Sequence, residues 1–190
     1  MNAVVHYGCI IQKDAAAVKG CGCSFAAFPA RRVYFFFSDH RVAMEVIPVT
    51  ELELFARLIQ CEAGGEGDNG MRAVASVVMN RVRATSGEYG RYNTIRDVIY
   101  QPGQFNCART ELGGQQNLQN VYNMNPTQEH YDIANWAIAG NRLGNLGQAL
   151  WFYNPYSPTC RDNFPSTVGY FVFRIGNHCF YNPASSYYST

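Results

Sequence analysis

Two carboxyl side chains lie close together where a predicted helix ends. In the segment Glu62-Ala63-Gly64-Gly65-Glu66 they are four positions apart, with a glycine pair between them. The last turn of a helix opposes the ionisation of a carboxyl group by about 0.3–1 kcal/mol through the helix dipole. Because that energy is worth less than about one pKa unit, apolar burial must supply the rest if Glu62 is to be a general acid near neutral pH. Glu62 is therefore our candidate catalytic acid.

The second carboxyl group, that of Glu66, has a competing structural explanation. It comes just before the next predicted helix, where a carboxylate can accept hydrogen bonds from free backbone N–H groups. We therefore predict either a second catalytic carboxylate or a structural support at this position. A solvated surface glutamate is the alternative interpretation of Glu62, since most glutamates are exposed.

Cysteine and histidine side chains offer two other kinds of chemistry. Cys61, with His130 or His178 as its base, would make a cysteine hydrolase, although a helical cysteine is more often a small buried apolar residue. Four other side chains would make a zinc site if they met, but their positions show no ligand spacing: Cys107, Cys160, His178 and Cys179. We favour a Cys160–Cys179 disulfide in an oxidising compartment, and we predict no metal site and no cofactor.

The elements that must position these residues are helices followed by strands. Thr50-Glu51-Leu52-Glu53 is a capping box, and apolar residues at helical spacing predict that its helix runs to Glu62 or Ala63. A second, nearly buried helix should begin near Asp68, its N-cap candidate. We expect two further helices, from Thr94 to about Pro102 and from Pro126 to Gly140, with a polar loop at 111–125 between them. Strands should follow at 150–153, 170–175 and 179–181. Helices first and a small antiparallel sheet last indicate the α+β class.

Composition argues against two kinds of partner. The 190 residues carry 15 Lys and Arg against 14 Asp and Glu, a formal charge of +1, whereas a nucleic-acid-binding protein displays a basic stripe. No apolar run approaches the roughly 20 residues that span a bilayer, and we recognise no secretory signal at the N-terminus. We therefore expect no nucleic-acid partner and no membrane partner.

Aromatic residues make up 14% of the chain, which suits a neutral polar ligand such as a sugar. Those of the predicted strands should be mostly core residues, with a few lining a sugar cleft: Trp151, Tyr153, Tyr170, Phe173 and Tyr181. Residues 1–43 show no sustained period. We expect 1–43 to be an N-terminal arm of unassigned role, disordered or loosely packed, and 44–190 to be the catalytic domain.

Five collinear segments resemble the spore cortex-lytic cell wall hydrolases of the SleB/CwlJ type, and the CwlJ branch more closely. Together they extend over residues 52–183, about two-thirds of the chain. The segments are Glu62-Ala63-x-x-Glu66-Gly67, Gly70 through Asn80-Arg81-Val82, Thr94-Ile95 through Gln104-Phe105, Leu150 through Pro155, and Ile175 through Tyr181.

The resemblance implies a helical domain like that of lysozymes and lytic transglycosylases, with a small antiparallel sheet in the C-terminal third. It implies that Glu62, the first glutamate of the family's Glu-Ala-x-Gly-Glu motif, is the catalytic acid, and that the substrate is cortex peptidoglycan degraded during germination. It also implies synthesis in the mother cell without a cleavable signal peptide, deposition in the spore coat, and spore-coat proteins as further partners. Gly64 departs from the family, which commonly has a side chain there, so any contact from that side chain is absent.

We therefore expect a lytic transglycosylase or muramidase that cleaves the glycan strand, with Glu62 as general acid and base. Gln104, Tyr153, Asn177 and His178 are secondary candidates for binding the substrate. Two alternatives stay open. One is an N-acetylmuramoyl-L-alanine amidase or a Cys- or Zn-dependent stem-peptide hydrolase, and the other is a non-catalytic spore-coat or wall-binding protein.

Overall fold

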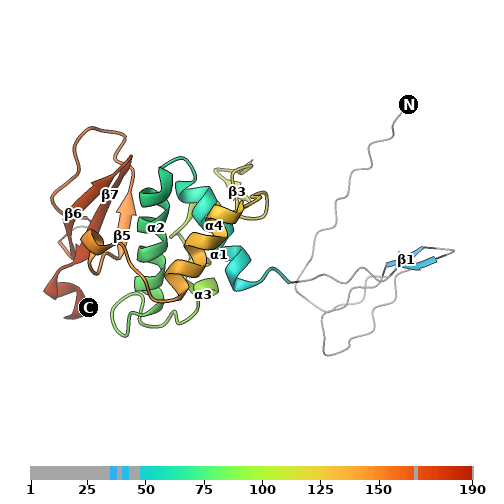
Figure 1. Ribbon diagram of the computed structural model, residues 1–190, viewed down its shortest axis with the longest axis horizontal. Coiled ribbons are helices and arrows are strands. Elements are labelled where there is room, and N and C mark those ends of the chain that lie inside the picture. Colours follow the sequence, from blue (N-terminus) through green and yellow to red (C-terminus); the bar gives the residue numbers. More distant parts are fainter. Residues whose placement is uncertain (1–34, 38–39, 43–47, 165–166, 190) are drawn as a thin grey trace. The chain divides into compact units, whose positions relative to one another are not determined.

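The computed structural model describes residues 35–37, 40–42, 48–164 and 167–189 (Figure 1). The chain divides into two units, Met1–Pro48 and Val49–Thr190. In the first unit, strands β1 (Phe35–Phe37) and β2 (His40–Val42) pair antiparallel. The rest of the arm expected at 1–43 lies outside the described residues, as does the expected domain boundary before residue 44. All the candidate site residues belong to the second unit.

Helix α1 (Glu51–Ala63) ends where the sequence predicts. Thr50 caps its first turn, because Thr50 Oγ1 accepts a hydrogen bond from the Glu53 backbone N–H at 3.1 Å. The reciprocal half of the predicted capping box is wrong: the Glu53 carboxylate instead pairs with Arg57, one turn further on, at 2.7 Å. The apolar face of α1 is buried, so Glu62 is carried on a helix that the core holds in place.

Helix α2 (Gly67–Val82) lies between the C-terminal sheet and helices α1 and α4 (Figure 1). Its wide apolar face is buried, as its sequence predicts. The expected N-cap at Asp68 is wrong, because Asp68 lies in the first turn and its carboxylate binds Arg72 at 2.6 Å. The N-cap position belongs to Glu66.

Two further helices begin close to their predicted starts. Thr94 caps α3 (Ile95–Ile99) by accepting a hydrogen bond from the Asp97 backbone N–H at 3.0 Å. At the start of α4 (Gln128–Ile138), Thr127 and His130 form a capping box. The described part of the chain also contains three short 3₁₀ helices: η1 (Asn106–Ala108), η2 (Gly144–Leu146) and η3 (Ser185–Ser189).

The predicted polar loop at 111–125 contains a small hairpin. Strands β3 (Glu111–Leu112) and β4 (Gln115–Gln116) pair antiparallel. Gly113 and Gly114 connect them with φ values of +58° and +78°. A two-residue turn with positive φ at both positions matches the twist of a hairpin and requires glycine-like residues. The glycine pair therefore makes a hairpin of a segment whose side chains are mostly polar.

The C-terminal sheet has the order β5-β7-β6 and is antiparallel throughout. Its strands are β5 (Trp151–Tyr153), β6 (Gly169–Ile175) and β7 (His178–Pro183). Trp151 and Tyr181 are buried as expected, whereas Tyr170 and Phe173, both on β6, are 47% and 37% exposed. Helices followed by this sheet confirm the α+β class.

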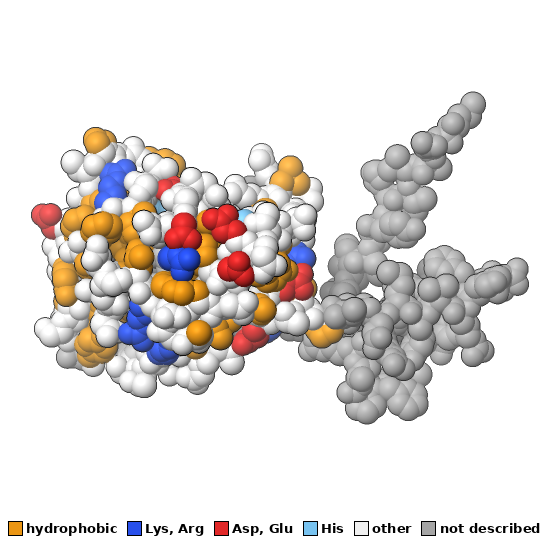
Figure 2. Space-filling model, in the orientation of Figure 1, with side chains coloured by type: hydrophobic (Ala, Val, Ile, Leu, Met, Phe, Trp, Pro, Cys, Tyr) orange, Lys and Arg blue, Asp and Glu red, His pale blue; other side chains and the backbone are white. Residues whose placement is uncertain are grey.

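Side chains of α2 join the helices to the sheet. Asn80 Nδ2 donates to the Gly147 and Ala149 carbonyls, and Arg81 Nε donates to the Leu150 carbonyl at 2.7 Å, just before β5. On the face drawn in Figure 2, acidic and basic side chains of the second unit are interspersed with hydrophobic ones. No described helix has the length and apolar character needed to cross a bilayer.

The predicted Cys160–Cys179 disulfide is confirmed, with Cα atoms 5.9 Å apart. Replacing both cysteines by serine should lower the free energy of unfolding by about 3 kcal/mol, because a bond across a sequence separation of 19 restricts the unfolded chain. Urea unfolding of the oxidised parent and of the double variant measures this difference. The reduced parent is the control and should unfold like the variant; equal midpoints for all three samples would contradict the prediction.

Candidate active site

The Glu62 side chain is half-buried in the last turn of α1 and does not extend into bulk solvent. Its Oε1 accepts a hydrogen bond from the thiol of Cys107, in η1, with Sγ and Oε1 2.9 Å apart. This contact joins two elements whose residues are 45 positions apart in the sequence. The candidate acid therefore lies at a junction between α1 and the segment that follows α3.

Burial and two neighbouring residues act on the ionisation of Glu62. Burial raises its pKa and is the largest effect, while the Cys107 hydrogen bond and the positive charge of Arg81 lower it; the net direction is upward. A carboxyl group with a raised pKa keeps its proton at higher pH, as a general acid must. Burial thus supplies what the helix dipole alone does not.

Arg81 is the nearby cation, and it lies in the core with 3% of its surface exposed. Beyond the Leu150 contact, its guanidinium carbon lies 4.7 Å from the ring centre of Tyr89 and 5.2 Å from that of Phe105. Burial lowers the pKa of Arg81, and the charge of Glu62 is among the effects that oppose this. An arginine nevertheless stays protonated in a protein, so a permanent positive charge acts on the candidate acid.

Glu66 is fixed to the turn between β6 and β7. Its Oε2 accepts a hydrogen bond from the Asn177 backbone N–H at 2.8 Å, and its Oε1 accepts one from Asn177 Nδ2 at 2.9 Å. Two glycines make room for this contact, because a Cβ on Gly70 or on Gly176 would overlap the Glu66 side chain. Gly176 also has a φ of +52°, which favours glycine.

His178 follows this turn and packs among aromatic rings. Its ring centre lies 5.3 Å from that of Phe152 and 6.4 Å from that of Phe180. Burial lowers the pKa of His178, and the charge of Glu66 opposes that shift. Phe152 in turn lies 6.3 Å from Phe105, the ring that faces Arg81. The structure thus brings Glu66, Asn177 and His178 together, with a row of rings leading toward Arg81.

The two remaining candidates occupy different surroundings. Gln104 Nε2 donates to the Glu88 carboxylate at 3.0 Å, and its Oε1 accepts from the Tyr89 hydroxyl at 3.0 Å. The ring of Tyr153 packs 4.6 Å from Phe164 and 5.8 Å from Tyr181. The side-chain contacts of Gln104 are therefore with Glu88 and Tyr89 and not with the acid, and Tyr153 belongs to a separate aromatic cluster.

The sequence does not predict the place of Cys107 or of Arg81 beside Glu62. Arg81 belongs to one of the segments that resemble the family, but a position in an apolar helix gives no signal that it lies near Glu62. Cys107 follows the Gln104-Phe105 motif by two positions, and only the three-dimensional fold brings it to the carboxyl group.

The residues of the two cysteine-based alternatives, a zinc site and a cysteine hydrolase, make other contacts in the structure. The zinc interpretation is wrong, since Cys160 and Cys179 are bonded to each other and Cys107 binds Glu62. Among the residues that the structure describes, no three His, Cys, Asp or Glu side chains gather as metal ligands. Cys61 directs its thiol to the Gln119 carbonyl at 3.5 Å, and His130 Nδ1 takes part in the α4 capping box.

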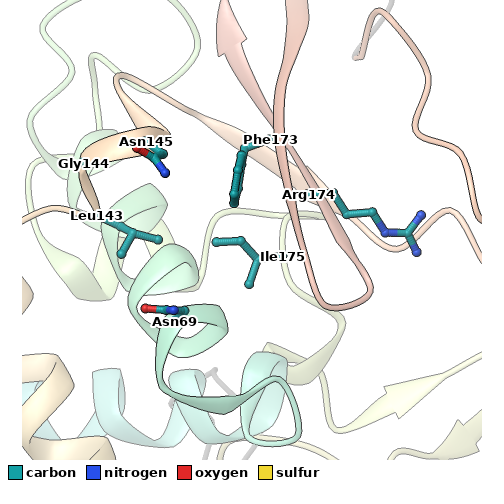
Figure 3. Close-up of a pocket in the computed structure, with 7 residues that line it drawn as sticks. All are labelled: Asn69, Leu143, Gly144, Asn145, Phe173, Arg174 and Ile175. Atoms are coloured by element: carbon teal, nitrogen blue, oxygen red, sulfur yellow. The ribbon is translucent and has the colours of Figure 1, made fainter.

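A pocket of about 380 Å³ lies between the start of α2, η2 and β6, and Glu62 does not line it (Figure 3). Its lining combines apolar and amide side chains with one arginine: Asn69, Leu143, Gly144, Asn145, Phe173, Arg174 and Ile175. The Arg174 guanidinium points away from the pocket, toward the Ser157 and Pro158 carbonyls that it binds. The side chains that face the pocket are therefore uncharged.

Known proteins with similar sequences identify the family. The profile of the cell wall hydrolase family matches residues 65–181, more than half of the chain, and the chain belongs to that family. It is 32% identical over 146 residues to the cell wall hydrolase CwlJ of Bacillus subtilis strain 168, covering 75% of this chain and 93% of that protein. It is 30% identical to the CwlJ of Halalkalibacterium halodurans, covering 75% and 94%.

Two solved structures have a similar fold. One is the catalytic domain of the germination-specific lytic transglycosylase SleB from Bacillus anthracis, with a TM-score of 0.50 and 26% identity, covering 74% of this chain and 100% of that domain. The other is the catalytic domain of the Bacillus cereus SleB protein, with a TM-score of 0.52 and 26% identity, covering 70% and 89%. The resemblance seen in the sequence and the expected fold are confirmed.

The Glu62 carboxyl group should titrate above the ordinary range of a glutamate, because burial outweighs Cys107 and Arg81, which lower its pKa. Carbon-13 NMR of the side-chain carboxyl carbons as a function of pH measures this midpoint, and Glu62→Gln assigns the resonance. A midpoint at or below that of glutamate in an unstructured peptide would show that burial does not dominate.

Proposed function

We propose that this protein is a peptidoglycan hydrolase that cleaves the glycan strand of spore cortex during germination, with Glu62 as general acid and base. The observation that carries the proposal is a half-buried carboxyl group with a raised pKa, at the end of α1, in a member of the cell wall hydrolase family. The family match begins at residue 65, so the role of Glu62 rests on its geometry and on its motif.

The proposed reaction begins with proton transfer from Glu62 to the oxygen between N-acetylmuramic acid and N-acetylglucosamine. The C–O bond breaks as this oxygen becomes the hydroxyl group of the leaving sugar. The Glu62 carboxylate then removes the proton of the muramyl 6-hydroxyl, whose oxygen bonds to the anomeric carbon and closes an anhydro ring. Glu62 ends the cycle protonated, so one carboxyl group serves both steps.

We favour this single-acid route because Glu66 has other contacts. Both of its carboxylate oxygens accept hydrogen bonds from Asn177, which supports a role in holding the β6–β7 turn. A hydrolytic muramidase would need a carboxylate free to activate water at a separation of about 5–9.5 Å from the acid. Glu66 is therefore proposed as a structural support, with Asn177 and His178 beside it as substrate-orienting residues. Gln104 and Tyr153 stay candidates for the same role.

The names of similar proteins support a place for this chain in the spore. Two relatives are named cell wall hydrolase CwlJ, and the SleB of Bacillus anthracis is described as germination-specific. We propose that the chain acts on cortex peptidoglycan from the outer layers of the spore, where spore-coat proteins would be its neighbours.

Glu62→Gln should reduce cleavage of purified cortex peptidoglycan by about 10²–10⁴-fold, because glutamine keeps the shape of the side chain but has no proton to donate. The matched control is Glu111→Gln, which alters an exposed glutamate of β3. Mass spectrometry of released muropeptides gives the product: anhydro ends for the proposed reaction, reducing ends for hydrolysis, and new free amines for an amidase or peptidase. Equal cleavage by parent and Glu62→Gln would show that another group is the acid, whereas no cleavage by either would favour a binding protein.

Glu66→Gln should keep cleavage within about tenfold of the parent while lowering the free energy of unfolding by about 1 kcal/mol, since it removes one of two acceptors for Asn177. Cleavage rates and urea unfolding are measured on the same preparation. A loss of activity as large as that of Glu62→Gln, in a variant of unchanged stability, would make Glu66 a second catalytic carboxylate.

A further inference from the structure

The thiol of Cys107 touches the candidate acid, and the proposed reaction has not yet assigned it a part. Cys107 is 4% exposed, and its Sγ lies 2.9 Å from Glu62 Oε1. The backbone of the same residue also lowers the pKa of Glu62. One buried residue therefore acts on the group that is proposed to transfer the proton.

The direction of the Cys107–Glu62 hydrogen bond follows from the state of the thiol. The neighbouring Cys61, burial and the charge of Glu62 all raise the pKa of Cys107, so its hydrogen stays on the sulfur. A thiol sulfur is also only a weak acceptor. Glu62 Oε1 is consequently the acceptor, and in the neutral carboxyl group the acidic proton belongs on Oε2.

We propose that Cys107 is a positioning residue for Glu62: its thiol holds Oε1 toward the protein interior, so that Oε2 presents the proton to the substrate. This inference rests on the proposed function of Glu62. The terminal torsion of a glutamate has a broad distribution, and an unrestrained carboxyl group would present either oxygen. The thiol selects one of them.

Contacts behind the thiol keep Cys107 itself in place. Its carbonyl accepts a hydrogen bond from the Val121 N–H at 2.8 Å. The neighbouring Cys61 directs its thiol to the Gln119 carbonyl, and Gln119 Nε2 donates to the Cys61 carbonyl at 3.3 Å. The segment 117–121 thus contacts both Cys107 and Cys61, a residue of the last turn of α1.

The same contact assists the proton transfer. When Oε2 gives up its proton, negative charge develops on the carboxylate, and a donor already directed at Oε1 stabilises that charge without having to reorient. The thiol therefore favours both the orientation of the acid and its charged state. Removing the donor should weaken both effects.

Cys107→Ala and Cys107→Ser separate this role from simple space filling. In the full-length protein, Cys107→Ala should move the carbon-13 titration midpoint of Glu62 to higher pH, because a donor that favours the carboxylate is lost. The alkaline limb of kcat/KM on purified peptidoglycan should move in the same direction, since a general acid works while it is protonated. Its plateau should fall roughly tenfold, as expected for a misplaced catalytic group. Cys107→Ser keeps a donor and should restore both midpoint and plateau toward the parent.

Val98→Ala is the control for lost packing, because it removes part of a fully buried α3 side chain. It should lower the melting temperature without moving the Glu62 midpoint. Equal shifts in Cys107→Ala and Cys107→Ser, or an unchanged midpoint in Cys107→Ala, would overturn this inference even if Glu62→Gln is inactive. An active Glu62→Gln would instead overturn the proposed function, whatever the titration gives, since the titration requires no turnover.

Discussion

A positive charge in the core constrains much of this domain. The Arg81 guanidinium is almost fully buried, and a buried cation is costly unless polar or charged groups compensate it where it lies. Compensation comes from distant parts of the chain: the Leu150 carbonyl, the ring faces of Tyr89 and Phe105, the charge of Glu88 and, once it has given up its proton, that of Glu62. These groups belong to different segments. One side chain of α2 therefore contacts the residue before β5, the segment before α3 and the residue before η1. Fold stability and the environment of the acid depend on the same residue.

This arrangement also limits how far the pKa of Glu62 is raised. Burial alone would make Glu62 hold its proton too tightly to give it up, because a general acid works best when its pKa is near the operating pH. Arg81 and Cys107 lower the pKa while burial raises it, so the raised value is a balance between opposing effects. The two lowering effects come from different places, one from the core and one from the edge of a polar segment. A single buried carboxyl group with neither neighbour would be a weaker candidate for both steps of the reaction.

What the sequence predicted well depends on neighbours along the chain. Caps at Thr50 and Thr94, the end of α1 beside Glu62 and the α+β order all follow from local spacing. The contacts that shape the site are between residues far apart in sequence, such as Cys107 with Glu62 and Glu66 with Asn177. No period or motif encodes such a pairing. The mostly polar composition of 111–125 likewise concealed both the hairpin and the role of 117–121 in securing the cysteines.

Two sets of contacts lie near Glu62: that between Glu66 and Asn177, and those that segment 117–121 makes with the two cysteines. They differ in the substitutions that they tolerate. The Glu66–Asn177 contact requires glycine at both Gly70 and Gly176, since a side chain at either would overlap Glu66, so the turn of the sheet is held by a fixed set of residues. The segment 117–121 instead reaches Cys61 and Cys107 largely through backbone groups and one amide side chain. Backbone contacts tolerate many side chains. The contacts behind Cys107 therefore depend more on the path of the backbone at 117–121 than on the side chains there, whereas the contact at Glu66 depends on the absence of two side chains.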